Sequence, residues 1–277
     1  MRHLKDRAII SISGAEAKSF LQGLITNDIG KLGPFAPLYA ALLTPQGKIL
    51  FDFLIIELGG AVLIDCWAPI SEALLKRLTI YRLRAKVELK LRDDVAIAWS
   101  PREEPEAADL LPDPRLKELG CRSVLPRESI AGLIDGTGAY LNVRLGLDVP
   151  EAGDFGSDKM FALDAGLEEL RGVSFEKGCY VGQELTARMK HRGTARKRLL
   201  AIVPTAGLEL PPAGTDIRAA GNSVGEIAAT YGGRGFGLIR LDRWTRGETA
   251  EAGGRPLHIG IPQWLRSKAP LHDAHLT

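Results

Sequence analysis

The chain has 277 residues, with 45% hydrophobic and 25% charged side chains, a composition that is ordinary for a soluble globular protein. Its length is sufficient for two or three domains that each bury a core. The formal net charge of +2 indicates neither a nucleic-acid partner nor an acidic substrate, because it conceals strong local clusters of charge.

Nothing in the sequence indicates contact with a membrane. The first residues, MRHLKDR, are not followed by an apolar run long enough for a signal peptide, and no stretch approaches the roughly 20 apolar residues of a membrane span. The three cysteines (Cys66, Cys121 and Cys179) are widely spaced, which fits a reducing compartment better than a disulfide framework. No C-x-x-C or Cys/His cluster predicts a metal held by the protein. We therefore expect a cytoplasmic protein without a membrane or metal site.

The first half of the chain predicts an α+β arrangement. Apolar runs between turns indicate strands, and segments with apolar residues at helical spacing follow Ser13 and Pro69. Residues 44–47 (TPQG) predict a turn, because proline stands at the second position and glycine at the fourth. The expected strands are Ala8–Ser13, Leu38–Leu43, Ile49–Ile56, Ala61–Trp67, Val87–Leu91, Val95–Trp99 and Cys121–Leu125.

The second half changes character twice. A helical pattern that contains Tyr140 and Arg144 indicates a return to the first domain. Short apolar runs then alternate with turns rich in glycine and proline, which is typical of a small β-barrel. This order predicts three domains: a discontinuous first domain (1–47 and 128–196), a ferredoxin-like domain inserted into it (48–127), and a C-terminal β-barrel (197–277).

The stretch from Gly172 to Gly193, GVSFEKGCYVGQELTARMKHRG, has few bulky apolar residues and many glycines and charges. Gly178 and Gly182 bracket Cys179 and predict a turn that opens a helix near Gly182. The free N–H groups of a helix start and the nearby Lys177 would favour a thiolate at Cys179. From the spacing alone, a small buried cysteine beside an ordinary turn is the simpler interpretation.

The octet KGCYVGQE in this stretch resembles the signature of the YgfZ family, folate-binding proteins related to the T-protein (aminomethyltransferase) of the glycine cleavage system. An octet with two fixed glycines and a cysteine is far more specific than an isolated glycine-rich loop. The resemblance implies an α+β fold, a three-domain ring like that of the T-protein. Further similar segments extend over most of the chain: LQGLITND (21–28), LLTPQGKILFD (42–52), YRLRAKV (81–87) and RLD (240–242).

The resemblance also implies a function. The protein would be a tetrahydrofolate-binding accessory protein for the assembly or repair of iron–sulfur clusters in enzymes such as tRNA-modifying radical enzymes. Its partners would be tetrahydrofolate, or a one-carbon derivative of it, and iron–sulfur client enzymes or assembly factors. Cys179 would be the chemically active thiol and Lys177 its electrostatic partner. The residues that would bind the ligand or order the turn are Tyr180, Gln183, Glu184, Arg144 and Asp65.

Asp65 is a candidate because it is the one charge in an apolar strand. Such a carboxylate either faces water at the edge of a strand or faces a cavity, where it would hold the amino and N–H groups of a pterin ring. Asp52 has the same pattern, so the sequence does not distinguish between the two interpretations.

Two basic runs stand outside these assignments. Each run alone fits a solvated face, but together they suggest a polyanion, either the glutamate tail of a folate or RNA phosphates. No aromatic RNA-binding motif accompanies them, which favours the folate tail, and we expect no contact with DNA. The first run comprises Lys76, Arg77, Arg82, Arg84 and Lys86, and the second comprises Arg188, Lys190, His191, Arg192, Arg196, Lys197 and Arg198.

Two other functions stay open at this point. A true aminomethyltransferase would make methylene-tetrahydrofolate, but that family generally has an aspartate–aromatic pair where this chain has Cys179 and Tyr180. An RNA-binding module without catalysis would depend on the basic runs alone. Whether the chain is an enzyme is therefore undecided by its sequence.

Overall fold

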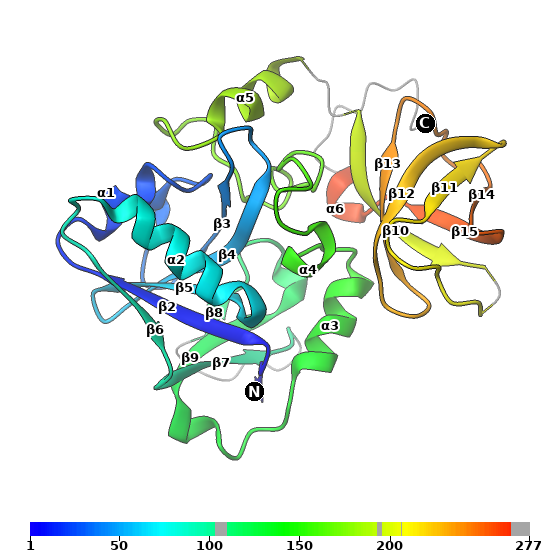
Figure 1. Ribbon diagram of the computed structural model, residues 1–277. Helices are drawn as coiled ribbons and strands as arrows, with labels where there is room; N and C mark the ends of the chain where they lie inside the picture. Colours follow the sequence, from blue (N-terminus) through cyan, green and yellow to red (C-terminus); the bar gives the residue numbers. More distant parts are fainter. Residues whose placement is uncertain (103–109, 193–195, 206, 267–277) are drawn as a thin grey trace.

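The computed structural model describes residues 1–102, 110–192, 196–205 and 207–266. The chain forms an α+β body built on two antiparallel sheets, followed by a closed β-barrel (Figure 1). This architecture confirms the α+β class and the C-terminal barrel predicted from the sequence. The last residue of the signature stretch, Gly193, lies outside the described residues.

The larger sheet of the body has five strands in the order β3-β4-β5-β2-β6. Helices α1 (Ala17–Gln22) and α2 (Ser71–Arg82) cover one face, where Leu21, Leu74 and Leu78 share a core with Ile10. Ile9 belongs to the core on the other face, because neighbouring residues of a strand point to opposite sides. The strands are β2 (Arg7–Ser13), β3 (Leu38–Leu43), β4 (Ile49–Leu58), β5 (Ala61–Trp67) and β6 (Glu88–Arg92).

The smaller sheet has the order β1-β7-β9-β8 and contributes to the second core of the larger sheet. Trp99 of β7 packs in this core, and its Nε1 donates a hydrogen bond of 2.7 Å to Leu119 O. The strands are β1 (Arg2–His3), β7 (Val95–Ser100), β8 (Leu111–Pro112) and β9 (Cys121–Pro126). Single-turn helices connect the elements of the body: η1 (Ile29–Lys31), η2 (Ala68–Ile70), η3 (Lys117–Leu119) and η4 (Arg127–Ile130).

The strand pairing corrects the expected boundary of the inserted domain. β3 and β4 form one hairpin across the boundary placed between residues 47 and 48, and Gly47 N donates to Thr44 O at 2.8 Å in its turn. β2, from the expected first domain, lies between β5 and β6 of the expected insertion. Residues 48–127 therefore do not form a sheet of their own. A tight turn joins two strands of one sheet as readily as it separates two domains, and the sequence alone does not distinguish these cases.

The barrel closes through six antiparallel strands in the order β10-β13-β12-β11-β14-β15, and β10 pairs with both β13 and β15. Closure leaves no unpaired sheet edge. The strands are β10 (Lys197–Pro204), β11 (Asp216–Ala219), β12 (Asn222–Thr230), β13 (Gly235–Arg240), β14 (Ala250–Ala252) and β15 (Arg255–Gly260).

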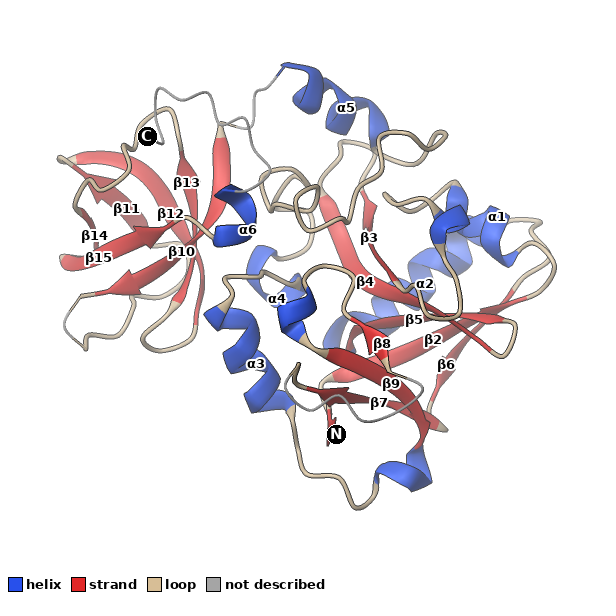
Figure 2. Cartoon of the chain, turned by 180° about the vertical axis from the view of Figure 1, so that it is seen from behind, coloured by secondary structure: helices blue, strands red, loops and turns tan. Residues whose placement is uncertain are grey.

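Three helices lie around the junction between body and barrel (Figures 1 and 2): α3 (Thr137–Gly146), α4 (Ala152–Phe155) and α6 (Gln263–Arg266). Helix α5 (Gln183–Arg192) lies on the body, next to the turn between β3 and β4. Trp264 of α6 donates a hydrogen bond of 3.0 Å from Nε1 to Leu147 O, which joins α6 to the end of α3. The barrel is thus attached to the body by specific contacts.

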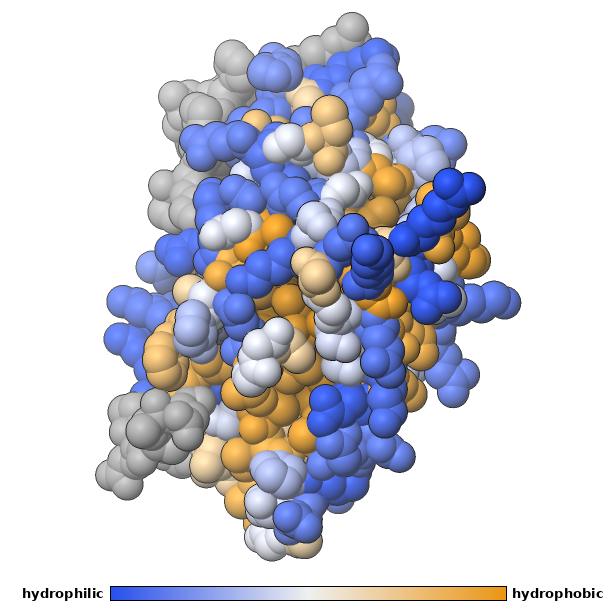
Figure 3. Space-filling model, turned by 90° about the vertical axis from the view of Figure 1, so that its left-hand side faces the viewer, coloured by the Kyte–Doolittle hydropathy of each residue, from blue (hydrophilic) through white to orange (hydrophobic). Residues whose placement is uncertain are grey.

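The surface of the body is mixed in polarity. The side that lies on the left in Figure 1 has apolar areas bordered by hydrophilic side chains (Figure 3). Phe35, Ile80 and Leu83 are large hydrophobic residues that are more than half exposed. Isolated exposed apolar residues are normal, but these three lie beside a cavity or a charged cluster. None of the described helices is long and apolar enough to cross a bilayer.

Candidate functional site

The signature stretch packs against the β3–β4 hairpin. Its residues before Gln183 form turns and irregular backbone, and α5 begins at Gln183, as the sequence predicts. Gly182 has a φ of +83°, and a Cβ there would lie 2.5 Å from Thr44 O. Glycine is therefore required at this position. The TPQG turn and the signature, which are separate motifs in the sequence, are in direct contact in the structure.

Lys177 is buried, whereas Cys179, two residues further on, is exposed. Its Nζ donates hydrogen bonds of 2.6 Å to Gln22 O and to Ile25 O, and it lies 4.9 Å from the centre of the Tyr180 ring. Burial lowers the pKa of Lys177 to about 8, although the nearby charge of Asp28 acts in the opposite direction. Lys177 thus ties the signature turn to the end of α1. Within the described residues, no hydrogen bond links its Nζ to the thiol of Cys179.

The three cysteines differ in exposure. Cys179 is exposed, Cys121 is partly buried and Cys66 is buried. Burial raises the pKa of Cys66 to about 12 and raises the pKa of Cys121 above its ordinary value. The simpler interpretation of Cys179 as a small buried residue is wrong. Cys179 is the thiol that a partner can reach directly.

The other candidates in the signature have local roles. Tyr180 is buried and presents its ring to Lys177, and its backbone N–H donates a hydrogen bond of 3.3 Å to Gln183 Oε1. Gln183 therefore orders the turn. The Glu184 side chain is 88% exposed and accepts a hydrogen bond of 3.1 Å from Arg188, one turn along α5. These contacts stabilise the loop and the start of α5.

Asp65 lies inside the molecule, away from solvent. Its carboxylate accepts hydrogen bonds from Arg7 Nε at 2.6 Å and from Arg122 NH1 at 2.7 Å, and all three side chains are at most 6% exposed. Both oxygens are thus occupied by guanidinium groups. This arrangement shows no free carboxylate oxygen for a pterin ring.

Asp65 is one member of a larger buried cluster of charges that fills the space between the sheets and α3. Arg115 donates to Asp113 and to Glu151, each at 2.7 Å, and the hydroxyl of Tyr140 donates to Glu151 at 2.6 Å. Burial raises the pKa of Glu151, but Arg115, Arg7 and other guanidinium groups outweigh it and hold the pKa well below its usual range. We call this set the charged centre: Arg7, Asp65, Asp113, Arg115, Arg122, Tyr140 and Glu151.

Arg144 lies at the junction with the barrel. Its NH1 donates to Asp154 at 2.5 Å, and Tyr231, which follows barrel strand β12, donates from its hydroxyl to the same carboxylate at 2.6 Å. Its guanidinium carbon is also 5.7 Å from the centre of the Tyr231 ring. Arg144 therefore joins α3, α4 and the barrel, and its charge is compensated inside the protein.

A cavity of about 880 Å³ opens next to the start of the signature stretch. Its lining includes the buried ring of Tyr39 and the buried side chain of Arg115, whose guanidinium lies 5.2 Å from the centre of that ring. Asn27 also lines it, and its Nδ2 donates hydrogen bonds of 2.8 Å to Tyr39 O and to Arg171 O. The polar groups of Asn27 are thus satisfied by the protein itself. The exposed aromatic ring of the lining is that of Phe35, which is 66% exposed.

The mouth of the cavity carries positive charge. Lys31, Lys117 and Arg171 line it and are exposed, and the described part of the chain forms no ion pair with any of them. Three carboxylates also line it, but Glu168 is paired with Lys190, Glu118 with Arg102 and Asp113 with Arg115. The uncompensated charge at the mouth is therefore positive and favours an anionic ligand group.

The candidates predicted from the sequence do not form one site. Five belong to the signature stretch, Asp65 belongs to the charged centre, and Arg144 lies at the junction with the barrel. The end of α1 and the segment after it connect the signature to the cavity, because the carbonyls of Gln22 and Ile25 hold Lys177 while Asn27 lines the cavity. The cavity itself was missed, because its residues come from distant segments. The one sequence signal is Arg171, which immediately precedes the signature.

Neither basic run lines the cavity among the described residues. Three cations of the second run are compensated by carboxylates: Arg188 pairs with Glu184, Lys190 with Glu168 and Arg198 with Glu169. The first run lies at the end of α2 and borders a different hollow. The described residues also contain no group of three or more His, Cys, Asp and Glu side chains placed to hold a metal ion.

The chain is thus a T-protein-like α+β protein with a C-terminal barrel, and its signature carries an exposed cysteine. The aminomethyltransferase T of the glycine cleavage system from Bartonella henselae has a similar structure, with a TM-score of 0.76 over 95% of this chain and 85% of that one. Only 15% of the residues are identical, so this similarity concerns the fold.

The sequence relatives identify the family. The human mitochondrial iron–sulfur cluster assembly factor IBA57 is 31% identical over 94% of this chain and 84% of its own length, and the mouse protein is 30% identical over 92% and 79%. The IBA57 homologue of Neurospora crassa is 35% identical over 72% of this chain and 52% of its own length. Residues 196–267 match the model of the CAF17 C-terminal β-barrel domain. The chain therefore belongs to the IBA57/CAF17 family of iron–sulfur cluster assembly factors, the YgfZ type that its signature resembles.

Proposed function

We propose that this protein supports the assembly or repair of iron–sulfur clusters through the exposed thiol of Cys179, and that it binds a tetrahydrofolate in the cavity beside the signature. Its clients would include radical enzymes that modify tRNA. The function in cluster assembly is supported by the names of its relatives and by one observation above all, the exposure of Cys179 on a turn that Lys177 fixes in place.

The chemistry of that observation fits the proposal. Thiolates are the usual protein ligands of iron–sulfur clusters, and an exposed thiol is accessible to a cluster carried by another protein. A single cysteine supplies too few ligands to hold a cluster alone. A cluster bound through Cys179 would therefore be shared with a partner, and it would be cargo in transit rather than a resident cofactor.

The folate proposal is supported by the shape and charge of the cavity. Its volume of about 880 Å³ lies in the range of ordinary small-molecule sites. The Phe35 ring, which lines the cavity and is 66% exposed, offers a surface for stacking an aromatic ring. The uncompensated cations at the mouth, Lys31, Lys117 and Arg171, suit the carboxylates of a glutamate tail. A folate has this combination of a flat aromatic body and an anionic end.

Depletion of the protein in its own organism tests the proposed role in cluster assembly. The activities of several iron–sulfur enzymes, including a tRNA-modifying radical enzyme, would be measured together with those of enzymes that lack a cluster. We expect the first group to lose activity at unchanged protein amounts and the second group to be unaffected. An equal loss in both groups, or no loss in either, would contradict the proposal.

Calorimetric titration with mono- and triglutamyl tetrahydrofolate tests the cavity. Because charge contacts are screened by salt, we expect tighter binding of the triglutamyl form and weaker binding of both forms at high salt. Lys117→Ala and Arg171→Ala should each reduce the preference for the longer tail several-fold, whereas Lys76→Ala, in the basic run outside the cavity, should not. Equal affinities for both forms in all variants would remove these cations from the folate site.

Two other outcomes would favour the other functions considered above. Formation of methylene-tetrahydrofolate from an aminomethyl donor would indicate a transferase. Salt-dependent RNA binding that tetrahydrofolate does not displace would indicate a separate RNA site.

A further inference from the structure

The end of α2 carries a concentration of positive charge that the proposed function does not use. Lys76, Arg82, Arg84 and Lys86 are exposed and Arg77 is partly exposed, and the described residues offer none of them an ion-pair partner. The second basic run is different, because three of its cations are paired with carboxylates. Arg82 lies in the last turn of α2, where its positive charge interacts favourably with the negative end of the helix dipole. Arg84 and Lys86 lie beyond the helix and have no such role.

Apolar side chains are exposed within the same surface. Ile80 is 57% exposed, and Leu83, at the end of α2, is 87% exposed, the largest value among the exposed large hydrophobic residues of the described chain. Lys76 and Ile80 are four residues apart on α2 and so share a face of the helix. Leu83 has a φ of +45°, a backbone conformation that a leucine rarely adopts. The chain thus directs a large apolar side chain into solvent between arginines.

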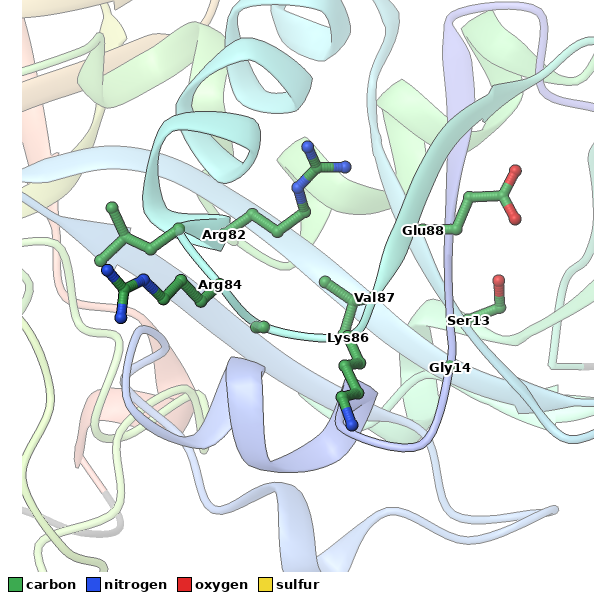
Figure 4. Close-up of a pocket in the computed structure, with 9 residues that line it drawn as sticks. Ser13, Gly14, Arg82, Arg84, Lys86, Val87 and Glu88 are labelled. Carbon is green, nitrogen blue, oxygen red and sulfur yellow. The ribbon is translucent and has the colours of Figure 1, made fainter.

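A hollow of about 490 Å³ lies beside these residues, between the loop that follows α2 and the turn at Ser13–Gly14. Figure 4 shows that Arg82, Arg84 and Lys86 extend in different directions from this loop. Two acidic residues are nearby. Glu16 accepts a hydrogen bond from the backbone N–H of Lys86, and Glu88 lies on β6 on the opposite side of the hollow from Arg84. Neither carboxylate forms an ion pair with the cations.

We infer that the surface formed by Ile80, Leu83, Arg82, Arg84 and Lys86 is a docking site for another protein, whose contact face carries an apolar side chain flanked by several carboxylates. The apolar residues would be buried at the centre of the contact, and the cations at its rim would pair with the carboxylates of the partner. This arrangement of an apolar centre and a charged rim is that of specific protein interfaces.

Two observations favour an acidic protein over other anions. Cations that diverge do not converge on one phosphate or one small carboxylate, whereas they match charges spread over a protein face. An RNA would leave Ile80 and Leu83 without apolar partners, and the surface offers a single half-buried aromatic residue, Tyr81, for stacking bases. The apolar part of the surface is explained by a protein partner and not by a nucleic acid.

Site-specific photo-crosslinking in the intact protein tests this inference. Ile80→benzoylphenylalanine places the crosslinker on the exposed face of α2, and Ile134→benzoylphenylalanine, at a residue that is 66% exposed elsewhere on the body, is the control position. Both variants would be expressed in cells of the organism itself, irradiated and purified, and crosslinked peptides would be identified by mass spectrometry. We expect a crosslink from position 80 to a segment with more acidic than basic residues, and none to that segment from position 134.

Charge reversal provides the second arm. Arg84→Glu combined with Lys86→Glu should reduce the crosslink from position 80 by about tenfold, because two attractions become repulsions. The matched control is Arg188→Glu combined with Lys190→Glu in the compensated run, which should leave the crosslink unchanged. A nuclease-sensitive product, no product above that of position 134, or a product insensitive to reversal at 84 and 86 would each overturn the inference. Unchanged melting temperatures would show that the variants are folded.

Discussion

The signature loop and the charged centre both contain buried charges, but they use them for opposite purposes. In the signature loop, one buried ammonium, that of Lys177, is held by backbone carbonyls and leaves the neighbouring Cys179 free at the surface. In the charged centre, Asp65 is enclosed by two guanidinium groups and has no free oxygen. The first arrangement presents a reactive group, whereas the second joins secondary structure elements to one another.

This difference shows how far residue type indicates function. Asp65 was a candidate because it is the one charge in an apolar strand, whereas Arg144 and Lys177 were candidates because of the family resemblance. The structure occupies all three with contacts inside the protein, and the exposed candidate with a reactive group is Cys179. Single substitutions can test whether the charged centre stabilises the fold and whether the signature exposes the thiol of Cys179 to solvent.

Removing Asp65 should produce the largest loss of stability. Asp65→Ala leaves Arg7 and Arg122 buried without their shared carboxylate, and breaking a buried pair in this way costs about 3–5 kcal/mol in the free energy of unfolding. Chemical denaturation measures this value. Asp242→Ala, which removes an exposed ion pair with Arg240, is the control and should cost less than about 1 kcal/mol. Equal small losses would mean that the centre does not stabilise the fold.

Lys177→Met should have the next largest effect. It keeps the apolar part of the side chain but leaves Gln22 O and Ile25 O without their donor, at a cost of about 1–3 kcal/mol. Lys190→Met, at an exposed position on α5, should change stability by less than about 0.5 kcal/mol. Hydrogen exchange should also quicken in the signature loop of Lys177→Met. Unchanged stability and exchange would show that Lys177 does not fix the loop.

Asp52 tests the electrostatics at the edge of the charged centre. Burial, and then the charge of Glu151, raise the pKa of Asp52 from 3.8 to about 6 in the folded protein, where its Oδ2 accepts a hydrogen bond from Tyr39. The folded state therefore binds the proton more tightly than the unfolded state. The resulting stabilisation is complete below pH 3.8 and is lost as the pH rises through 6.

Asn at position 52 cannot ionise, so Asp52→Asn should gain stability relative to the native protein between pH 4 and pH 7, by about 1–3 kcal/mol. The measurement is chemical denaturation of both proteins at several pH values. Asp216→Asn on the barrel surface, where the aspartate side chain is 49% exposed, should show no comparable trend. A constant difference between the native protein and Asp52→Asn would show that Asp52 does not titrate in this range.

Chemical labelling of the three cysteines tests the exposure of each thiol, with the smallest effect on the fold. At neutral pH, iodoacetamide should modify Cys179 first, Cys121 more slowly and Cys66 slowest, in the order of their exposure and of the raised pKa of Cys66. Mass spectrometry gives the three rates from one sample. If Cys179 reacts no faster than Cys66, the signature does not present its thiol to solvent.

Local patterns predicted much of the fold. Proline and glycine in the TPQG segment predicted the hairpin turn, alternation of apolar runs with glycine-rich turns predicted the barrel, and the glycines around Cys179 predicted an open turn before α5. Each of these features depends on residues that are close in the sequence. The boundary of the inserted domain could not be predicted in this way, because it depends on whether β2 pairs with β5 and β6 from a distant part of the chain.

The same limit applies to the site. Asp65 is paired with Arg122, which is 57 residues away, and no local pattern connects them. Lys177 contacts carbonyls more than 150 residues away, so its burial is invisible in the octet that contains it. The cavity combines segments near residues 31, 115 and 171. Sequence similarity indicated the family, but which side chains are free was decided by long-range packing.

The role proposed for the Cys179 thiol is tested most directly by the substitution Cys179→Ser, which removes the reactive thiol with little change in size. Tetrahydrofolate affinity would be measured with the purified variant. The activity of an iron–sulfur enzyme would be measured in cells that contain the variant and lack the native protein, with Cys66→Ala as a control. We expect unchanged stability and folate affinity, but enzyme activity as low as in cells without the protein. Full enzyme activity with Cys179→Ser would contradict the role proposed for the thiol.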